Sequence, residues 1–224
     1  MLDADGSETG RTISIPSGTK ASPAVVDGRA YVADQQGTVQ VLDISSGRVV
    51  AEIATGMSQP VAHTPAYGSG RLVFVGRRGT VSAVDTRSNR LVWEHQLSSG
   101  SGSFTVHDNV VFVRARDELL ALNLSNGQVV FGPISGVSTD PTVTQSVRFS
   151  SGGTGPTGNP ETRTVIAVGM ENGSVALLDT DSGRRLASVS VNGTPMASAA
   201  TVNGRLVFGL DTGELVFIHP DGVQ

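Results

Sequence analysis

The sequence predicts an all-β protein, and three observations support this prediction. The chain of 224 residues has 28 glycines and 10 prolines but only 16% charged residues, which suits short strands joined by tight turns. Short apolar stretches end at pairs such as Asp27-Gly28, which favour hairpin turns. These stretches lack the i, i+3, i+4 spacing of an amphipathic helix and recur along the whole chain.

The recurrence is an internal repeat with a period of roughly 40 residues, the length of one four-stranded propeller blade. Within the first repeat, strands are expected at Ala24–Val26, Ala30–Ala33, Val39–Leu42 and Val49–Ile53. We therefore predict a single domain over residues 1–224, a β-propeller of five four-stranded blades at about 22–55, 64–97, 103–134, 140–191 and 197–219.

The two ends of the chain suggest how the ring closes. The last repeat supplies only three strands, and residues 11–16 precede the first complete repeat. We expect Thr12–Ile15 to pair with Glu214–Ile218 as the fourth strand of the last blade, which would remove two exposed strand edges. The alternative is an open fragment of a larger propeller.

A segment rich in Gly, Ser, Thr and Pro interrupts the fourth repeat at residues 145–163. Such a composition cannot bury a core, so we expect a mobile insertion between the first and second strands of that blade.

The turn before the outermost strand carries a family resemblance. Asp43 is followed by Gly47, and Asp85 by Asn89 and then Trp93, while the third repeat has Phe131 in the place of the tryptophan. This pattern resembles the pyrroloquinoline-quinone-type, or quinoprotein-like, propeller repeats, in particular the non-enzymatic branch that includes the propeller lipoprotein of bacterial outer-membrane assembly. The resemblance implies that Trp93 and Phe131 cover the neighbouring blade.

The resemblance also implies what an active quinoprotein dehydrogenase would need. In such enzymes the quinone lies between a tryptophan floor and a disulfide of adjacent cysteines, and acidic residues bind calcium. This chain has no cysteine, and its single tryptophan, Trp93, occupies the outer docking position. The four histidines fall at different repeat positions, so no catalytic triad or metal site is expected. We predict no enzymatic activity, no cofactor and no metal.

Four arginines are candidates for binding a protein partner. They lie at or beside the hairpins between second and third strands of two successive blades: Arg77, Arg78, Arg114 and Arg116. Because propeller hairpins of this kind share one face, these guanidinium groups are expected to form a positive sector that suits carboxylates. The alternative is a solvated rim with internal Arg–Asp pairs.

Three further residues on the connections between blades are candidates for the same role. Met57 and Met196 lie on inter-blade segments, and His63 precedes the innermost strand of the second blade. Methionines near a channel mouth would contact a partner peptide, or they would fill the narrow axis of the ring.

The composition limits the function further. The net charge of -4 gives no reason to expect nucleic acid, and no apolar run is long enough to span a bilayer. The first residues lack the features of a signal peptide. They resemble the middle of a repeat, so we expect the chain to begin inside a longer precursor. We predict a monomeric protein-interaction scaffold or sensor module in the periplasm or cell envelope. A small-ligand-binding propeller and a vestigial quinoprotein dehydrogenase fragment are the alternatives.

Overall fold

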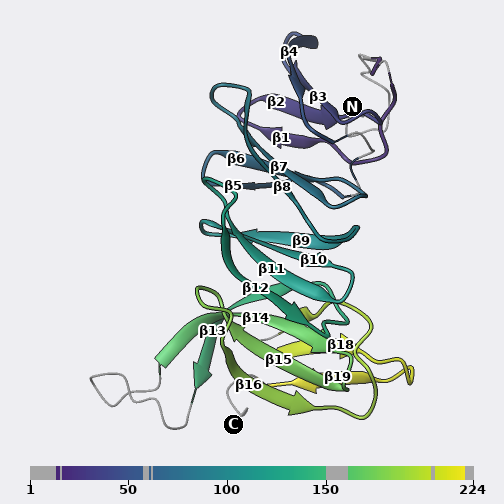
Figure 1. The fold of residues 1–224 in the computed structure, drawn as a ribbon, viewed down its shortest axis with the longest axis vertical. Coiled ribbons are helices and arrows are strands. Elements are labelled where there is room, and N and C mark those ends of the chain that lie inside the picture. Colours follow the sequence, from purple (N-terminus) through teal and green to yellow (C-terminus); the bar gives the residue numbers. More distant parts are fainter. Residues whose placement is uncertain are drawn as a thin grey trace, which may run out of the picture. The chain divides into compact units, whose positions relative to one another are not determined.

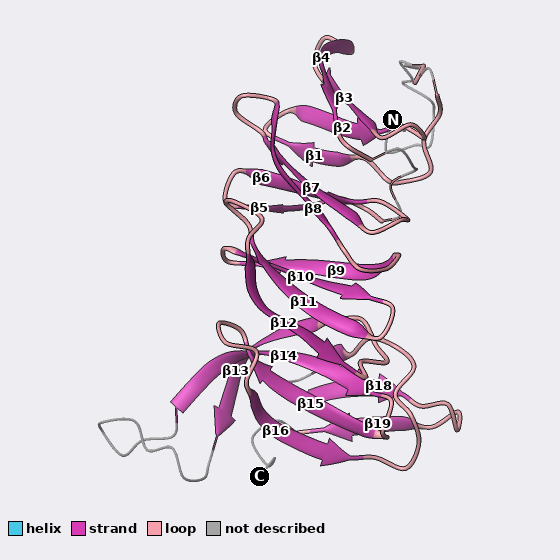
Figure 2. Ribbon diagram, viewed as in Figure 1, coloured by secondary structure: helices cyan, strands magenta, loops and turns pink. Residues whose placement is uncertain are grey.

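A computed structural model of the chain describes residues 14–15, 17–57, 61, 63–149, 161–202 and 205–219 (Figure 1). Strands and loops make up this part of the chain, as Figure 2 shows, and it contains no helix that could cross a membrane. The strands form five antiparallel sheets, four with four strands and one with three. The predicted all-β architecture of repeated blade-like sheets is confirmed. The chain divides into two compact units, Met1–Leu97 and Ser98–Gln224.

The first unit contains two four-stranded sheets, in the orders β1-β2-β3-β4 and β5-β6-β7-β8. Each strand therefore pairs with its neighbour in sequence. The strands are β1 (Ala24–Val26), β2 (Arg29–Ala33), β3 (Thr38–Asp43), β4 (Arg48–Ala54), β5 (Ala66–Gly68), β6 (Arg71–Val75), β7 (Thr80–Asp85) and β8 (Arg90–Gln96).

The second unit contains three sheets in the same meander order, the last with three strands. Its strands are β9 (Ser101–His107), β10 (Val110–Ala115), β11 (Glu118–Asn123), β12 (Val129–Ser135), β13 (Thr142–Phe149), β14 (Glu161–Met170), β15 (Ser174–Asp179), β16 (Arg185–Ser190), β17 (Ala200–Val202), β18 (Arg205–Gly209) and β19 (Leu215–Ile218).

Turn chemistry explains why these hairpins form where they do. In the β1–β2 turn, Asp27 and Gly28 both have positive φ, 48° and 72°, as a two-residue hairpin of this type requires. Ser69 and Gly70 repeat this geometry in the β5–β6 turn, with φ of 45° and 75°. The turn before each outer strand also ends on a residue with positive φ, and four of these residues are Gly47, Asn89, Gly127 and Gly183.

The core of the first unit lies between its two sheets. Tyr31 and Val41 from the first sheet pack in one cluster with Leu72 and Phe74 from the second. Met57, on the connection between the sheets, belongs to the same cluster and is 1% exposed. Burying a side chain of this size contributes about 1.5–3 kcal/mol, so Met57 stabilises the contact between the sheets.

In the second unit, the middle sheet has a core on each of its faces. Ile166 and Val168 of β14 pack in a cluster with Phe112 of the preceding sheet. Val165 and Ala167, which alternate with them along the same strand, pack in a cluster with Phe208 of the following sheet. Because successive side chains point to opposite faces of a strand, this alternation is the signature of sheets stacked like propeller blades.

The last sheet ends in the strand β19, of which Leu215 and Phe217 are 65% and 60% exposed. The predicted partner of this strand, residues 11–16, falls mostly outside the described residues. Ser14 and Ile15 are described and belong to no strand. Ring closure by Thr12–Ile15 and Glu214–Ile218 therefore stays a prediction, as does the single domain over residues 1–224.

The structure corrects the boundaries of the insertion predicted at residues 145–163. Strand β13 continues to Phe149 and β14 begins at Glu161, with these two residues paired and a register shift between Thr144 and Val147. An antiparallel hairpin extends for as long as its backbone groups face each other, whatever the composition of the loop beyond it. What remains of the predicted loop, residues 150–160, lies outside the described residues.

Replacing Gly37 with alanine tests how closely the two sheets are joined. Gly37 has φ of 87°, and an added Cβ would overlap the backbone carbonyl of Met57. Gly28 is a matched control in the same sheet, because its φ is 72° and an added Cβ would meet nothing within 4 Å. We expect Gly28→Ala to cost roughly 1–2 kcal/mol and Gly37→Ala roughly 2 kcal/mol more, measured by urea unfolding. Equal losses would show that Met57 does not hold this hairpin.

Candidate pocket between the first two sheets

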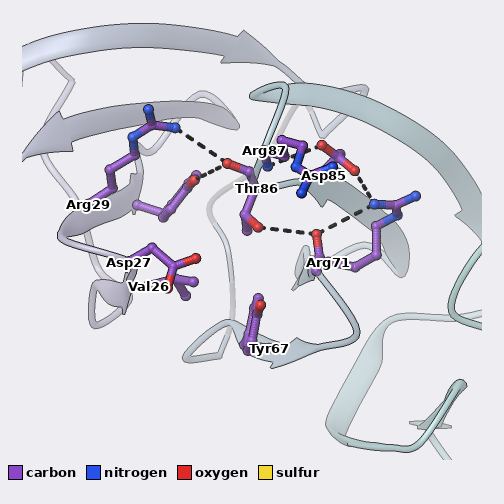
Figure 3. A pocket seen from close by; sticks show the side chains of 10 residues that line it. Val26, Asp27, Arg29, Tyr67, Arg71, Asp85, Thr86 and Arg87 are labelled. Atoms are coloured by element: carbon purple, nitrogen blue, oxygen red, sulfur yellow. Dashed lines mark hydrogen bonds and ion pairs between the residues drawn. The ribbon is translucent and has the colours of Figure 1, made fainter.

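A pocket of about 560 Å³ lies in the first unit, where the two sheets meet (Figure 3). The β1–β2 and β5–β6 turns contribute to its wall, and so does the turn between β7 and β8. Its lining combines arginine, aspartate and tyrosine with few apolar side chains: Val26, Asp27, Arg29, Tyr31, Tyr67, Gly70, Arg71, Asp85, Thr86 and Arg87. Its size is that of a small-molecule site, which spans about 300–1,000 Å³.

Asp85 organises the turn at the centre of the pocket. Its Oδ1 accepts hydrogen bonds from the backbone N–H of Ser88 at 2.7 Å, the Ser88 hydroxyl at 2.8 Å and the N–H of Arg87 at 3.1 Å. The Ser88 hydrogen bonds, and then the charge of Arg71, hold the pKa of Asp85 below its ordinary value. Asp85 is therefore an anion at neutral pH.

The same turn recurs in the first sheet, where Asp43 takes the place of Asp85. The hydroxyl of Ser45 and the N–H and hydroxyl of Ser46 donate to Asp43 at 2.7–2.8 Å. These hydrogen bonds, that of the Ser45 hydroxyl first, lower the pKa of Asp43 to about 2. Asp residues favour such positions because a carboxylate can satisfy the N–H groups of its own turn.

Strand register places an arginine opposite each of these aspartates. Arg71 on β6 is the Cα partner of Asp85 on β7, and its Nη1 forms an ion pair with Asp85 Oδ2. Arg29 on β2 is likewise the Cα partner of Asp43 on β3. Its guanidinium, however, extends to the second sheet, where Nη1 lies 3.4 Å from the carbonyl oxygen of Thr86.

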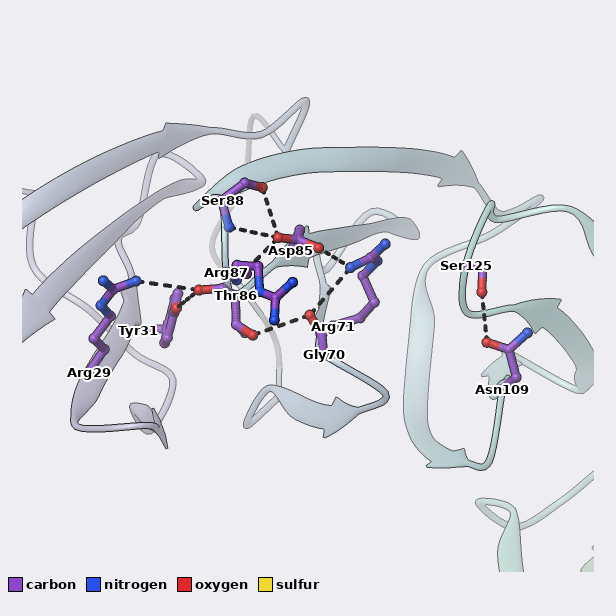
Figure 4. A network of polar contacts seen from close by, with 10 residues as sticks. All are labelled: Arg29, Tyr31, Gly70, Arg71, Asp85, Thr86, Arg87, Ser88, Asn109 and Ser125. Carbon is purple, nitrogen blue, oxygen red and sulfur yellow. Dashed lines mark hydrogen bonds and ion pairs between the residues drawn. The ribbon is translucent and has the colours of Figure 1, made fainter.

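Tyr31 makes the shorter contact between the two sheets (Figure 4). Its hydroxyl oxygen lies 3.1 Å from the Thr86 carbonyl oxygen and 3.0 Å from Asn89 Oδ1, and these two acceptors share its single proton. Burial raises the pKa of the Tyr31 hydroxyl, so it remains a proton donor. Tyr31 and Arg29 together join the first sheet to the β7–β8 turn of the second.

The residues on the outer strands explain why a tyrosine hydroxyl makes the contact between the first two sheets. In the second unit, Phe131 of β12 lies against Gly183, where an added Cβ would overlap its ring. The prediction that Phe131 covers the neighbouring blade is thus confirmed. Ala51 holds the corresponding place in the first sheet, and Asn89 the place of the glycine. A small residue at the docking position leaves the Asn89 side chain in reach of the Tyr31 hydroxyl.

The pocket is equipped for recognition more than for reaction. A guanidinium group offers several N–H donors in a fixed plane, so Arg29, Arg71 and Arg87 suit the orientation of a bound anion. The ring of Tyr67, 49% exposed, supplies an apolar wall.

The predicted partner-binding residues of the first unit differ in how exposed they are. Arg77 and Arg78 form the exposed tip of the β6–β7 hairpin, as expected. His63 is half-buried. Met57 is in the core, with its side chain beside Gly76 and its carbonyl beside Gly37, so it is not available to a partner peptide. The β2–β3 and β6–β7 hairpins, which carry these two glycines, cover it.

In the second unit, Arg116 and Met196 are exposed, the latter by 63%. Arg114 is half-buried, and its Nε donates to Asp140 Oδ1 at 2.9 Å while its Nη1 donates to the carbonyl of Arg116 at 3.0 Å. This is the internal Arg–Asp pair that the sequence offered as the alternative. Because Arg77 and Arg114 belong to different units, a shared positive sector stays a prediction.

Sequence reasoning missed the arginines of the pocket, although a signal was present. Arg29, Arg71 and Arg205 each follow a glycine in the sequence and begin a second strand. In the first two of these repeats an aspartate also stands at the end of the following strand, and opposite charges at such positions indicate cross-strand pairs. What the repeat could not indicate is that the first of these arginines extends to the neighbouring sheet.

The residues present do not fit a quinone cofactor. The indole of Trp93 is 8% exposed and lies on the outer strand β8 opposite Ala83, so it cannot serve as the floor of a cofactor site. The sequence has no cysteine to supply the opposing disulfide. Within the described ranges, no three His, Asp or Glu side chains group together as metal ligands.

The stacked four-stranded sheets with Asp-capped outer turns define a β-propeller of the quinoprotein-like class. The chain belongs to the family described as outer membrane protein assembly factor BamB, whose model matches residues 1–219. The resemblance predicted from the repeat is therefore confirmed. No curated protein matches the sequence.

Solved structures agree on the fold. The computationally designed Ika8 protein is 17% identical with a TM-score of 0.63, over 91% of this chain and 59% of that chain. BamB from Moraxella catarrhalis is 17% identical with a TM-score of 0.50, over 92% and 73%. Quinohemoprotein alcohol dehydrogenase from Comamonas testosteroni is 13% identical with a TM-score of 0.60, over 92% and 42%. This chain thus spans less than two thirds of the designed protein and of the dehydrogenase.

Replacing Tyr31 with phenylalanine should weaken the contact between the first two sheets. The variant removes one buried hydroxyl and leaves Asn89 Oδ1 and the Thr86 carbonyl without that donor. We expect a loss of roughly 1–2 kcal/mol in urea unfolding. In a double-mutant cycle with Asn89→Gly, the two losses should fall short of additivity by at least 0.5 kcal/mol, on the order of a direct contact. Full additivity would contradict the contact.

Replacing Asp43 with asparagine tests the charge of the turn. Because the folded pKa of about 2 lies below the ordinary value, the carboxylate contributes stability above about pH 4 and loses it as the pH falls through 2. Asparagine keeps the acceptor oxygen, as Asn123 does in the third sheet. The wild type should therefore exceed Asp43→Asn in Tm at pH 5–7, with the difference shrinking towards pH 2. A difference independent of pH would contradict this assignment.

Proposed function

We propose that the chain is a non-catalytic protein-interaction scaffold on the extracytoplasmic side of a cell envelope. Membership of a family described as an outer membrane protein assembly factor supports this proposal. The match extends over residues 1–219, so it concerns the propeller as a whole and not a single motif.

The observation that carries the proposal is the exposed tip of the β6–β7 hairpin. Arg77 and Arg78 are both exposed, and Gly76 behind them is buried against Met57. Met57 also contacts Gly37 in the β2–β3 hairpin, whose tip residues Gln35 and Gln36 are exposed. One buried methionine therefore fixes two adjacent hairpins while their polar tips face solvent.

Further contacts hold the same region in place. Gln96 donates from Nε2 to the carbonyl of Arg78 at 2.9 Å, and the Thr55 hydroxyl donates to the carbonyl of Gly37. In the described part of the chain, neither Arg77 nor Arg78 forms an ion pair. Their guanidinium groups are thus available to carboxylates on a partner, and a rigid backbone lowers the entropy lost on docking.

The pocket between the first two sheets favours a second candidate, a propeller that binds a small ligand. Its volume and its arginines are the supporting features. This role does not exclude the first, because the pocket and the Arg77–Arg78 tip share no residue.

Charge reversal at the tip tests the scaffold proposal. The double variant Arg77→Glu, Arg78→Glu should reduce capture of envelope proteins by the chain at least about ten-fold, equivalent to about 1.4 kcal/mol of binding energy. Chemical cross-linking in an envelope extract, followed by mass spectrometry, measures this. The matched control is Arg184→Glu, Arg185→Glu, an exposed adjacent pair that makes the same change of charge. Equal capture by wild type and both variants would overturn the proposed tip.

A further inference from the structure

We propose that the pocket between the first two sheets binds a monovalent carboxylate attached to an apolar or aromatic group. This inference rests on the second candidate function, a small-ligand site in this pocket, and names the class of ligand. The pocket shares no residue with the Arg77–Arg78 tip, so the inference can fail without the scaffold proposal. The family description names no ligand for this pocket.

The charges that line the pocket leave an excess of one positive charge. The lining contains three guanidinium groups, those of Arg29, Arg71 and Arg87, and two carboxylates, those of Asp27 and Asp85. Asp85 pairs with Arg71 and also accepts two N–H groups and a hydroxyl from its own turn, so this pair is internally satisfied. The balance matches a single negative charge on the ligand better than a phosphate dianion.

Arg29 and Arg87 keep hydrogen-bonding capacity for that charge. The contacts of Arg29 are to neutral oxygens and are long, 3.4 Å to the Thr86 carbonyl and 3.5 Å to Asn89 Oδ1. Arg87 uses its backbone N–H towards Asp85, and its side chain is exposed. Among the described residues, neither guanidinium has a carboxylate within ion-pair distance. A ligand carboxylate would replace weak contacts with charge-assisted ones.

The other walls determine what is attached to the carboxylate. Tyr67 lies across the pocket from the arginines, as Figure 3 shows, and its ring is 49% exposed. Val26 also lines the pocket. An exposed tyrosine ring gains by covering an apolar or flat group, which removes both surfaces from water. A carboxylate beside such a group occurs in small aryl acids and at the C-terminus of peptides that end in an aromatic residue.

Four probes test whether the pocket requires a carboxylate and which kind of molecule carries that carboxylate. They are 3-phenylpropionate and its amide, and N-acetyl-glycyl-phenylalanine with a free or an amidated C-terminus, each titrated into the chain and followed by NMR. We expect both carboxylates to bind with Kd on the order of 1 mM and about ten-fold more tightly than their amides. If the peptide acid binds more tightly than the aryl acid, the ligand is a peptide C-terminus; the reverse order indicates a small acid. Equal binding of acid and amide, or no binding of either acid at about 10 mM, overturns the proposal.

Variants locate the binding at the pocket. Arg87→Gln keeps the backbone N–H that Asp85 uses, so the turn should persist while affinity for the two acids falls about five- to ten-fold. Arg29→Gln should have a similar effect, with thermal unfolding measured to confirm that the sheets stay joined. Arg90→Gln is the matched control, since Arg90 is exposed on β8 and does not line the pocket. Loss of binding in the control to the same extent, or no loss in Arg87→Gln, would overturn the site.

Discussion

The structure depends on an aspartate side chain that accepts hydrogen bonds from the backbone of its own turn. At Asp43, Asp85 and Asp179 this turn reverses the chain before the outer strand, and each aspartate accepts an N–H three residues later. The bond costs little because carboxylate and donor are close in sequence. It fixes the position at which the outer strand begins.

From this turn follows the way in which neighbouring sheets meet. A turn that ends on a glycine accepts an aromatic ring from the preceding outer strand, as Gly183 accepts Phe131. A turn that ends on Asn89 presents an amide oxygen instead, and the Tyr31 hydroxyl of the preceding sheet donates a hydrogen bond to it. Both contacts lie at the turn before an outer strand. The Phe131 contact stabilises through apolar burial, and the Tyr31 contact through hydrogen bonds. The second leaves polar groups around the contact, and the pocket lies among them.

The repeat predicted the hairpins closely because each rests on neighbours in sequence. The Asp27-Gly28 turn and the strand Ala24–Val26 were predictable from local preference alone. Boundaries that depend on backbone pairing were not, as at Phe149 and Glu161, where the hairpin extends into a segment rich in small polar residues. Composition says how well a segment can bury a core, and hairpin extension requires only a facing strand.

Exposure of the candidate residues was predicted unevenly, and Met57 shows why. Its place on a connection between blades suggested contact with a partner peptide or a position in the axis of the ring, but the structure buries it between two hairpin glycines. Arg77 and Arg78 followed expectation because a hairpin tip points away from its own sheet whatever lies beside it. Arg114 differed because its partner Asp140 is 26 residues away along the chain.

Arg29 and Arg71 show which features follow from the repeat and which depend on packing between the sheets. The repeat determined that both arginines follow a turn glycine and lie opposite an aspartate in the adjacent strand. Arg71 pairs with that aspartate, whereas Arg29 extends to Thr86 and Asn89 of the next sheet. A long, flexible side chain takes the partner that the surrounding surface offers, and that surface exists only once the second sheet has packed against the first.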